Sequence, residues 1–127
     1  MTKQEFAKSF VVVKGADGKQ CKIPPRQFEQ LNQAITAING SGLKYRLIIL
    51  YGSCARSQAR FDSDIDLFVD MDASEIAAQL DVIRRLRNRV LTIYNPDIDI
   101  HFGSLETEEN NVYKNAIRRD GIALWKN

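Results

Sequence analysis

The stretch that decides the fold runs from Leu47 to Leu67 and reads LIILYGSCARSQARFDSDIDL. It opens with the apolar run Leu47–Tyr51, which is typical of a buried strand, and a second strand pattern begins at Asp64. Successive side chains of a strand point to opposite faces, so Asp64 and Asp66 are expected to share one face. The stretch therefore predicts two strands joined by a loop, with two carboxylates at the start of the second.

These two aspartates predict a metal site. Neighbouring carboxylates repel each other, and a divalent cation bound between them removes that repulsion. Mg²⁺ is the natural candidate, with Mn²⁺ as its substitute, because Mg²⁺ combines a couple of carboxylates with phosphate oxygens and water. An Asp-x-Asp pair on an exposed strand edge also occurs as a protection against aggregation. The metal interpretation therefore depends on what lies nearby.

The nearby Gly52-Ser53 pair predicts the phosphate-binding half of a nucleotide site. Gly52 lets the backbone approach a ligand closely after the buried strand. Ser53 is a good N-cap, and we expect a short helix over Ala55–Gln58 whose free N–H groups face a phosphate, with Arg56 one turn in. A Gly-Ser pair before a helix is also common as simple capping. Together with the aspartates at this spacing, it favours a nucleotide and metal site.

The residues resemble the minimal nucleotidyltransferase family of the polymerase beta superfamily. The family pattern is G-S-x-A-R-G, five variable residues, then S-D-I-D-L; this chain has GSCARS at 52–57 and SDIDL at 63–67. Ser57 stands where the family usually has Gly, a residue that permits an unusual backbone angle. The resemblance covers Phe28 to Trp125. It implies an α/β (α+β) nucleotidyltransferase fold, a mixed β-sheet with helices packed on it.

The resemblance also implies a role for each motif residue. The residues expected to bind the nucleotide are Gly52, Ser53, Arg56 and Ser63, and those expected to bind the metal and catalyse the reaction are Asp64, Asp66 and Asp99. The substrate it implies is ATP or another nucleoside triphosphate.

Asp99 belongs to a third strand, expected over Asp97–Phe102. Asp97, Asp99 and His101 alternate onto one face of this strand, and the polar face should lie toward the site. Asp99 is preferred as the third carboxylate because apolar residues flank it, whereas Asp97 follows a proline and is expected to belong to the turn. His101 is expected to be a solvated or hydrogen-bonded strand residue.

The rest of the chain predicts one domain of alternating elements. Residues 1–24 form an N-terminal extension with a β-hairpin of Phe10–Lys14 and Gln20–Ile23, and residues 25–127 form the nucleotidyltransferase domain. The first central strand is expected over Lys44–Tyr51. The sequence does not explain what the hairpin does.

Three helices are expected, each with an inward stripe. The first opens at Pro24-Pro25 and closes at Gly40, with Phe28, Leu31, Ile35 and Ile38 inward. A long second helix runs from a capping-box-like start at Asp72 and Glu75 to about Ile93, with Ile76, Leu80, Ile83, Leu86 and Val90 inward. The last lies within Ser104–Asp120 and stops at Gly121, with Val112, Ala116 and Ile117 inward.

Composition narrows the class of protein. The 127 residues carry 18 Lys plus Arg against 16 Asp plus Glu, so the overall charge does not mark a nucleic-acid binder. The arginines at 84, 85, 87 and 89 are expected to be the wet side of a helix, although an acidic partner or RNA is an alternative. No stretch predicts a membrane span or a signal peptide, so we expect a cytoplasmic protein. Cys21 and Cys54 are expected to be reduced thiols without chemistry, Cys54 partly exposed.

The function expected is metal-dependent nucleotidyl transfer. The chain is similar to the antitoxin of HEPN–nucleotidyltransferase toxin–antitoxin pairs, which implies transfer of AMP from ATP to a tyrosine of a partner nuclease. The chain's length leaves no room for an acceptor-holding domain, which points to a second polypeptide and a homo- or hetero-oligomer. Two alternatives remain open: a binding module that neutralises a partner by contact, and a stand-alone transferase for a small hydroxylated molecule such as an aminoglycoside.

Overall fold

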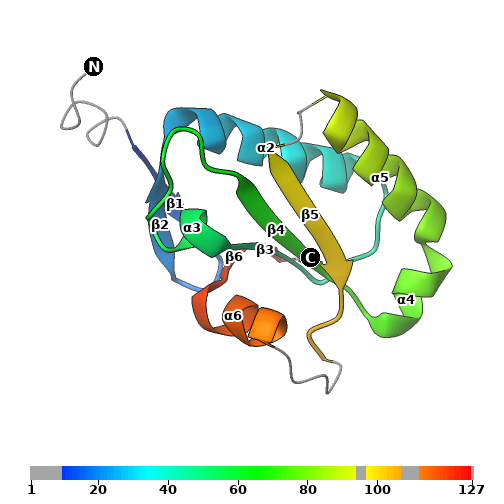
Figure 1. The fold of residues 1–127 in the computed structure, drawn as a ribbon. Helices are drawn as coiled ribbons and strands as arrows, with labels where there is room; N and C mark the ends of the chain where they lie inside the picture. The colour runs from blue at the N-terminus through cyan, green and yellow to red at the C-terminus, as the bar shows by residue number, and fades with distance from the viewer. Residues whose placement is uncertain (1–9, 94–96, 107–111, 127) are drawn as a thin grey trace.

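A computed structural model of the chain describes residues 10–93, 97–106 and 112–126. Figure 1 shows the fold. In chain order the elements are β1 Val11–Lys14, β2 Gln20–Ile23, α2 Pro25–Gly40, β3 Leu47–Tyr51, α3 Gly52–Ala55, β4 Ile65–Asp70, α4 Ala73–Ala78, α5 Leu80–Ile93, β5 Ile98–Gly103, α6 Val112–Asp120 and β6 Ile122–Lys126.

Four strands form the central sheet, in the order β5-β4-β3-β6. β4 and β5 are parallel, whereas β3 is antiparallel to β4 on one side and to β6 on the other. The expectation of a mixed sheet with helices on it is therefore confirmed. β6, for which the sequence analysis named no strand, is an edge strand of this sheet.

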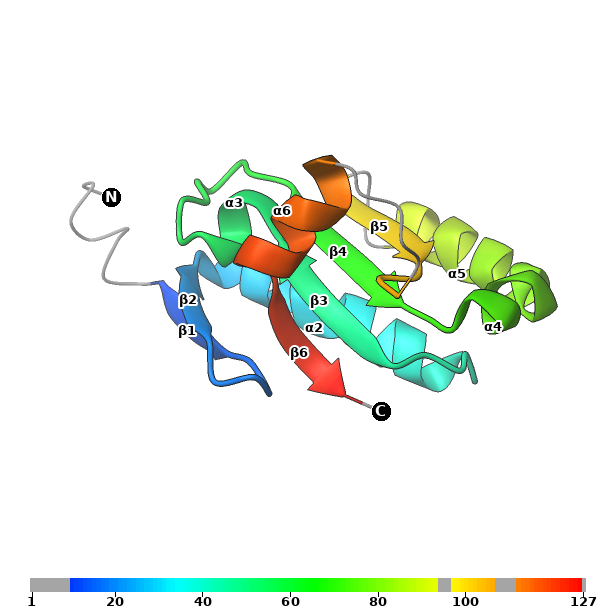
Figure 2. The ribbon, with the colours of Figure 1, turned by 90° about the horizontal axis from the view of Figure 1, so that it is seen from below.

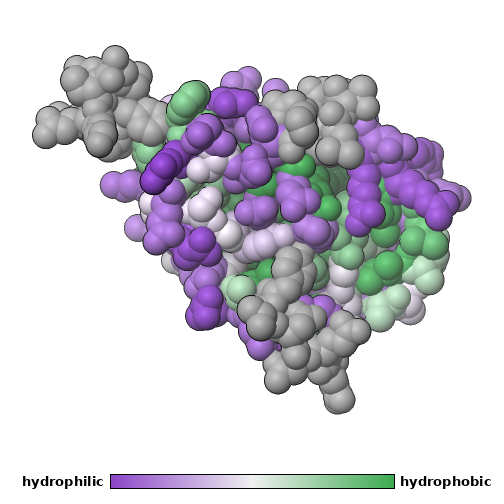
Figure 3. Space-filling model, viewed as in Figure 1, coloured by the Kyte–Doolittle hydropathy of each residue, from purple (hydrophilic) through white to green (hydrophobic). Residues whose placement is uncertain are grey.

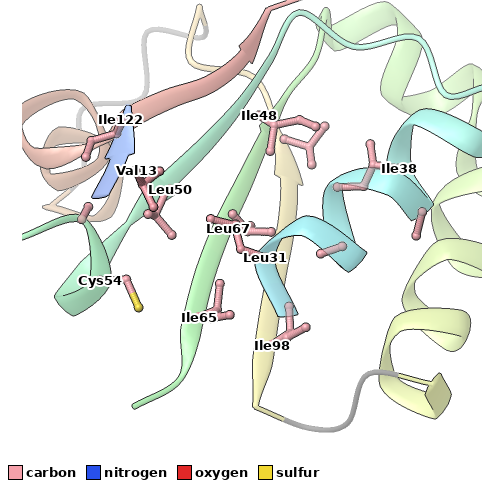
Figure 4. Close-up of a cluster of buried hydrophobic side chains, with 14 of the residues drawn as sticks. Val13, Leu31, Ile38, Ile48, Leu50, Cys54, Ile65, Leu67, Ile98 and Ile122 are labelled. Atoms are coloured by element: carbon pink, nitrogen blue, oxygen red, sulfur yellow. The ribbon is translucent and has the colours of Figure 1, made fainter. Parts of the chain in front are cut away.

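One face of the sheet forms the main hydrophobic core. Alternate residues of β3 and β4, such as Ile48, Leu50 and Leu67, point to this face and are fully buried. They pack against α2 through Leu31 and Ile38 (Figure 4), and α5 adds its own buried residues, Ile83 and Leu86. Burying a side chain of this size contributes about 1.5–3 kcal/mol, so this face provides most of the packing energy.

The opposite face is only partly covered. Ile49, Phe68 and Ile117 form a small buried cluster in which α6 packs on the sheet. Figure 2 shows α6 and α2 on opposite sides of the sheet. Leu47 and Tyr51, at the two ends of β3, are partly buried against this cluster.

The N-terminal hairpin is confirmed. β1 and β2 pair antiparallel with Val12 opposite Lys22, and they form a separate two-stranded sheet. The tip of the hairpin joins the central sheet at its edge, because the Ala16 N–H donates to the Ala123 carbonyl of β6 at 2.6 Å. The hairpin is thus attached to the central sheet by a backbone hydrogen bond.

The predicted long helix from Asp72 to Ile93 is wrong, since the chain breaks into α4 and α5 at Gln79. The Gln79 side chain accepts from the Lys44 N–H at 2.7 Å and donates to the Lys44 carbonyl at 3.2 Å, which fastens this break to the loop before β3. As a result Leu80 is 45% exposed instead of buried. Asp72 precedes α4 as expected, but its side chain makes no capping hydrogen bond.

Other details of the expected elements need smaller corrections. The first central strand begins at Leu47 and not at Lys44. In α2, Leu31 and Ile38 are buried, whereas Phe28 and Ile35 are only partly buried. The side chains of Val90 and Val112, which were also expected to point inward, lie outside the described part of the chain. Among the described residues, none of the helices has the length and apolar character that crossing a membrane requires.

Candidate active site

Gly52 turns the chain directly at the end of β3. Its φ is +74°, in the left-handed region that favours glycine. A Cβ at this position would lie 2.3 Å from Oδ2 of Asp66, which no side chain tolerates. Gly52 therefore lets the loop backbone come into contact with the Asp66 carboxylate, as the sequence predicted for a close approach.

The helix after this turn begins earlier than expected. α3 spans Gly52–Ala55, its N-cap is Tyr51, and no side chain caps it, so the prediction that Ser53 caps a helix over 55–58 is wrong. The helix starts at once because the left-handed turn at Gly52 redirects the chain without a linker. Ser53 is half-buried in the first turn, and its carbonyl accepts the Gln58 N–H at 2.9 Å.

Asp66 and Asp99 lie side by side on the face opposite the main core. In the parallel β4–β5 pairing Asp66 stands opposite Asp99, and in the β3–β4 pairing it stands opposite Tyr51. Residues paired across neighbouring strands point to the same face. Figure 3 shows this side of the molecule, where hydrophilic residues occupy the middle of the surface. The register of the sheet thus brings the second and third predicted carboxylates together.

The electrostatics of this group follow from its crowding. Burial of the half-buried Asp66 side chain raises its carboxyl pKa, and the negative charges of Asp99 and then Asp64 raise it further. His101 and Arg56 act in the opposite direction. When neighbouring carboxylates raise the pKa of a carboxyl group, a bound cation strongly favours its charged form.

Asp64 is exposed and comes immediately before β4. The Cys54 thiol donates to the Asp64 carbonyl at 3.5 Å, which joins α3 to the start of β4. Cys54 itself is fully buried, which corrects the expectation of a partly exposed thiol. Burial raises the pKa of the Cys54 thiol to about 12 and that of Cys21 to about 11, so both remain protonated at neutral pH.

The structure separates the two candidates for the third carboxylate. Asp97 forms an ion pair with Arg26 of α2, with 2.8 Å between Oδ2 and the guanidinium nitrogen. Asp99 instead stands beside Asp66, and its Oδ2 lies 2.9 Å from Nε2 of His101. Asp99 therefore stands next to Asp66 in the sheet, whereas the ion pair of Asp97 joins the turn before β5 to α2.

The loop between α3 and β4 carries the remaining predicted nucleotide-binding residues. Arg56 is exposed, and its Nε donates to the Gln58 side chain at 3.2 Å. The Ser63 hydroxyl accepts the Arg60 N–H at 2.7 Å, so it helps to shape the loop. Ser57 has a φ of +58°, which shows the unusual backbone angle at the position where the family has Gly.

Gln27 is a residue that the sequence analysis missed. It is 1% exposed on α2, and its Nε2 lies within hydrogen-bond distance of three loop carbonyls: Arg60 at 2.9 Å, Phe61 at 2.8 Å and Ser63 at 3.1 Å. Its position one helical turn before the buried Leu31 places it on the inward stripe of α2. A polar residue at an inward helical position was the signal that could have identified it.

The donor set fits a metal that is shared with a substrate. The described part of the chain contains no group of three or more His, Cys, Asp or Glu side chains that could hold a metal ion by itself. Mg²⁺ does not require such a cage, because it binds through one or two carboxylates with phosphate oxygens and water in the other positions. Asp66 next to the close-approaching Gly52 backbone, with Asp64 and Asp99 nearby, is suited to that arrangement.

Comparisons with known proteins identify the family of the chain and its fold. Residues 33–127 match the family described as "Polymerase beta, Nucleotidyltransferase". This is well over half of the chain, and the protein belongs to this nucleotidyltransferase family. Among curated proteins no match is found.

Solved structures show the same fold. A toxin–antitoxin complex with AMP-PNP is 24% identical over 76% of this chain and 73% of the other, with a TM-score of 0.51. A nucleotidyltransferase from Sulfolobus solfataricus is 17% identical over 80% of this chain and 81% of the other, also with a TM-score of 0.51. At these identities the likeness establishes the fold alone.

A third structure is more distant. It contains an MNT antitoxin in complex with a tri-AMPylated Shewanella oneidensis HEPN toxin, at 21% identity over 80% of this chain and 73% of the other and a TM-score of 0.47.

Proposed function

We propose that this nucleotidyltransferase moves AMP from ATP onto a hydroxyl of a partner protein, in a metal-dependent reaction, and that the partner is a HEPN-type toxin. The observation that carries the proposal is the pairing of Asp66 with Asp99 beside the Gly52 turn. Nucleotidyl transfer uses carboxylates that bind divalent metal ions and a backbone that phosphate groups can approach closely. Both features are present here.

Each site residue has a specific task in this proposal. Gly52 and Ser53 contact the triphosphate, with Arg56 and Ser63 on the loop beyond. Asp64 and Asp66 would hold Mg²⁺ or Mn²⁺, and Asp99 would lie on the side of the attacking hydroxyl. The metal supplies positive charge that stabilises the charge developing on the phosphate oxygens. The α-phosphorus is attacked, and pyrophosphate leaves.

The choice of a protein acceptor rests on the resemblance to antitoxins of HEPN–nucleotidyltransferase pairs. A complex of a toxin and an antitoxin with an ATP analogue shares this fold, which supports the same class of partner and the same nucleotide. An acceptor held by a second polypeptide also has a physical rationale, since fixing it in line with the α-phosphate can lower the barrier by roughly 7–11 kcal/mol.

The test measures the intact mass of the partner. The chain is incubated with ATP, Mg²⁺ and a purified HEPN-type protein as the partner, and the partner is expected to gain the mass of one or more AMP units. The Asp64→Asn, Asp66→Asn double variant should add none. Asp97→Asn is the matched control, because Asp97 is ion-paired with Arg26 outside the aspartate group, and it should retain transfer. Rapid modification of a small hydroxylated molecule alone would instead support the stand-alone transferase.

A nucleotide-binding module is the second candidate, and one observation favours it. Ser57 occupies a left-handed backbone conformation at the position where the family usually has Gly, so the loop carries a conformational cost that Gly would avoid. Such a module neutralises its partner by contact. Neutralisation of the partner by the Asp64→Asn, Asp66→Asn variant, with no added mass, is the result expected of this candidate.

A further inference from the structure

The N-terminal hairpin is bonded directly to the loop of the candidate active site. The Lys22 N–H of β2 donates to the hydroxyl of Ser57 at 3.0 Å. Ser57 is the residue in the left-handed conformation, where glycine would cost less. The serine hydroxyl therefore supplies an anchor that the family's usual glycine lacks.

The first turn of α2 holds the next part of the same loop. Gln27 directs its Nε2 at the carbonyls of Arg60, Phe61 and Ser63, and these contacts are shielded from water because Gln27 is almost completely buried. Buried hydrogen bonds of this kind define the shape of a loop, since leaving the carbonyls without a donor is costly. Two consecutive elements, β2 and α2, thus hold a loop that lies more than thirty residues further along the chain.

Packing supports the same connection. β2 contacts α3 directly, and Cys21 of β2 is buried in the same hydrophobic cluster as Cys54 of α3. Figure 1 shows the hairpin next to α3, and Figure 4 shows Val13 of the hairpin in the cluster that contains Cys54. The hairpin therefore contacts the first part of the motif, residues 52–57, at two places. It packs against α3, which begins at Gly52, and it forms a hydrogen bond with Ser57.

We infer that residues 20–27, the hairpin strand β2 and the first turn of α2, are a positioning element of the nucleotide site, with Ser57 and Gln27 as positioning residues. This segment precedes residues 33–127, the part that matches the family. It holds the loop from Ser57 to Ser63 in the shape that receives the triphosphate before the nucleotide arrives. The inference rests on the proposed function for its ligand, and on the contacts above for the element itself.

Substitutions at Ser57 separate positioning from stability. Ser57→Gly removes the anchor and also relieves the left-handed backbone, so its melting temperature should not fall, while its KM for ATP should rise about three- to tenfold with kcat nearly unchanged. Ser57→Ala should raise KM and lower the melting temperature. Ser57→Asn tolerates the left-handed conformation and keeps an acceptor oxygen, and it should restore KM to within about twofold of the parent.

A second pair of variants tests Gln27 without any nucleotide. Gln27→Met keeps the approximate volume but removes the Nε2 donor that lies within hydrogen-bond distance of the three carbonyls, and amide hydrogen exchange at residues 57–63 should become at least fivefold faster. Gln30→Met is the matched control, because Gln30 is a buried glutamine on the same helix, 8% exposed. It should leave exchange in that loop unchanged, even if it lowers the melting temperature.

The two proposals fail in different ways. If the parent chain neither binds nor transfers a nucleotide, the proposed function is wrong, and the exchange measurement still decides whether residues 20–27 hold the loop. If the parent binds ATP and transfers AMP, but Ser57→Gly and Gln27→Met keep its KM and its loop exchange rates, the positioning element is refuted. Faster loop exchange with a raised KM in both variants supports it.

Discussion

The two faces of strand β4 use one sequence, Ile65–Asp70, for opposite purposes. Ile65, Leu67 and Val69 point to one face and are buried completely in the main core. Asp66 points to the other face, where it is half-buried beside Asp99, and burial raises its carboxyl pKa. Because side chains alternate along the strand, β4 contributes packing energy on one face. On its other face it holds the Asp66 carboxylate, whose charged form is unfavourable without a ligand.

The largest expected difference between the faces appears when neighbouring residues are changed. Asp66→Asn should lower AMP transfer by at least about a hundredfold, because it removes a charged metal ligand, yet should leave the fold intact. Leu67→Ala should lower the free energy of unfolding by about 2–5 kcal/mol, because it empties a fully buried position. Transfer assays and urea unfolding of both variants measure the difference. Equal loss of stability in both would contradict the division of roles.

A third aspartate on the same face, Asp70, sharpens the comparison because it has a charged partner. Its Oδ1 lies 3.1 Å from the Arg46 guanidinium and accepts the Leu105 N–H at 2.8 Å, and the side chain is 7% exposed. Asp70→Asn should cost about 1.5–3 kcal/mol of stability in urea unfolding, since it removes the charge from a buried, bonded group. Metal-dependent ATP binding per folded molecule should remain at the parent level. Loss of that binding would place Asp70 in the site.

The smallest of the expected effects is the dependence of stability on pH that Asp66 causes. Because the pKa of Asp66 is raised on folding, its contribution to stability is largest below the unfolded value of about 3.9 and is lost as the pH rises through the folded value. In EDTA, Asp66→Asn should therefore melt above the parent near neutral pH, and the difference should vanish near about pH 3. Thermal melts of both proteins across this range provide the check. A parent that gained stability from Asp66 with rising pH would contradict the assigned shift.

The sequence predicted the parts of the fold that depend on local pattern. The strands around the motif, the hairpin and the register of Asp99 on the site face follow from alternation and turn residues, and the structure has them. The break at Gln79 could not be predicted in this way, because it depends on hydrogen bonds to Lys44, which is distant in sequence. The prediction that Ser53 caps a helix was wrong, because the sequence does not reveal that the chain already turns at Gly52.

The residues of the candidate site follow a pattern in the sequence, whereas the contacts that hold its loop do not. Gly52, Asp64 and Asp66 are recognisable because their spacing is a local pattern. Gln27 and Lys22 lie before the motif in the sequence and hold the loop between α3 and β4. Gln27 does so with its buried side-chain amide, and Lys22 with its backbone N–H. Neither contact has a sequence pattern of its own, since a backbone donor is present at nearly every residue.

Asp64 and Asp66 are proposed to bind a metal together with ATP, and the shift in melting temperature on adding Mg²⁺ and ATP measures this binding. A ligand that binds only the folded chain stabilises it by about 2.7 kcal/mol at a hundred times its dissociation constant, so the parent should show a clear rise, larger with both additions than with either alone. The Asp64→Asn, Asp66→Asn variant should show no joint rise, whereas Asp97→Asn should match the parent. If the melting temperature of the double variant rises as much as that of the parent, Asp64 and Asp66 are not the metal ligands.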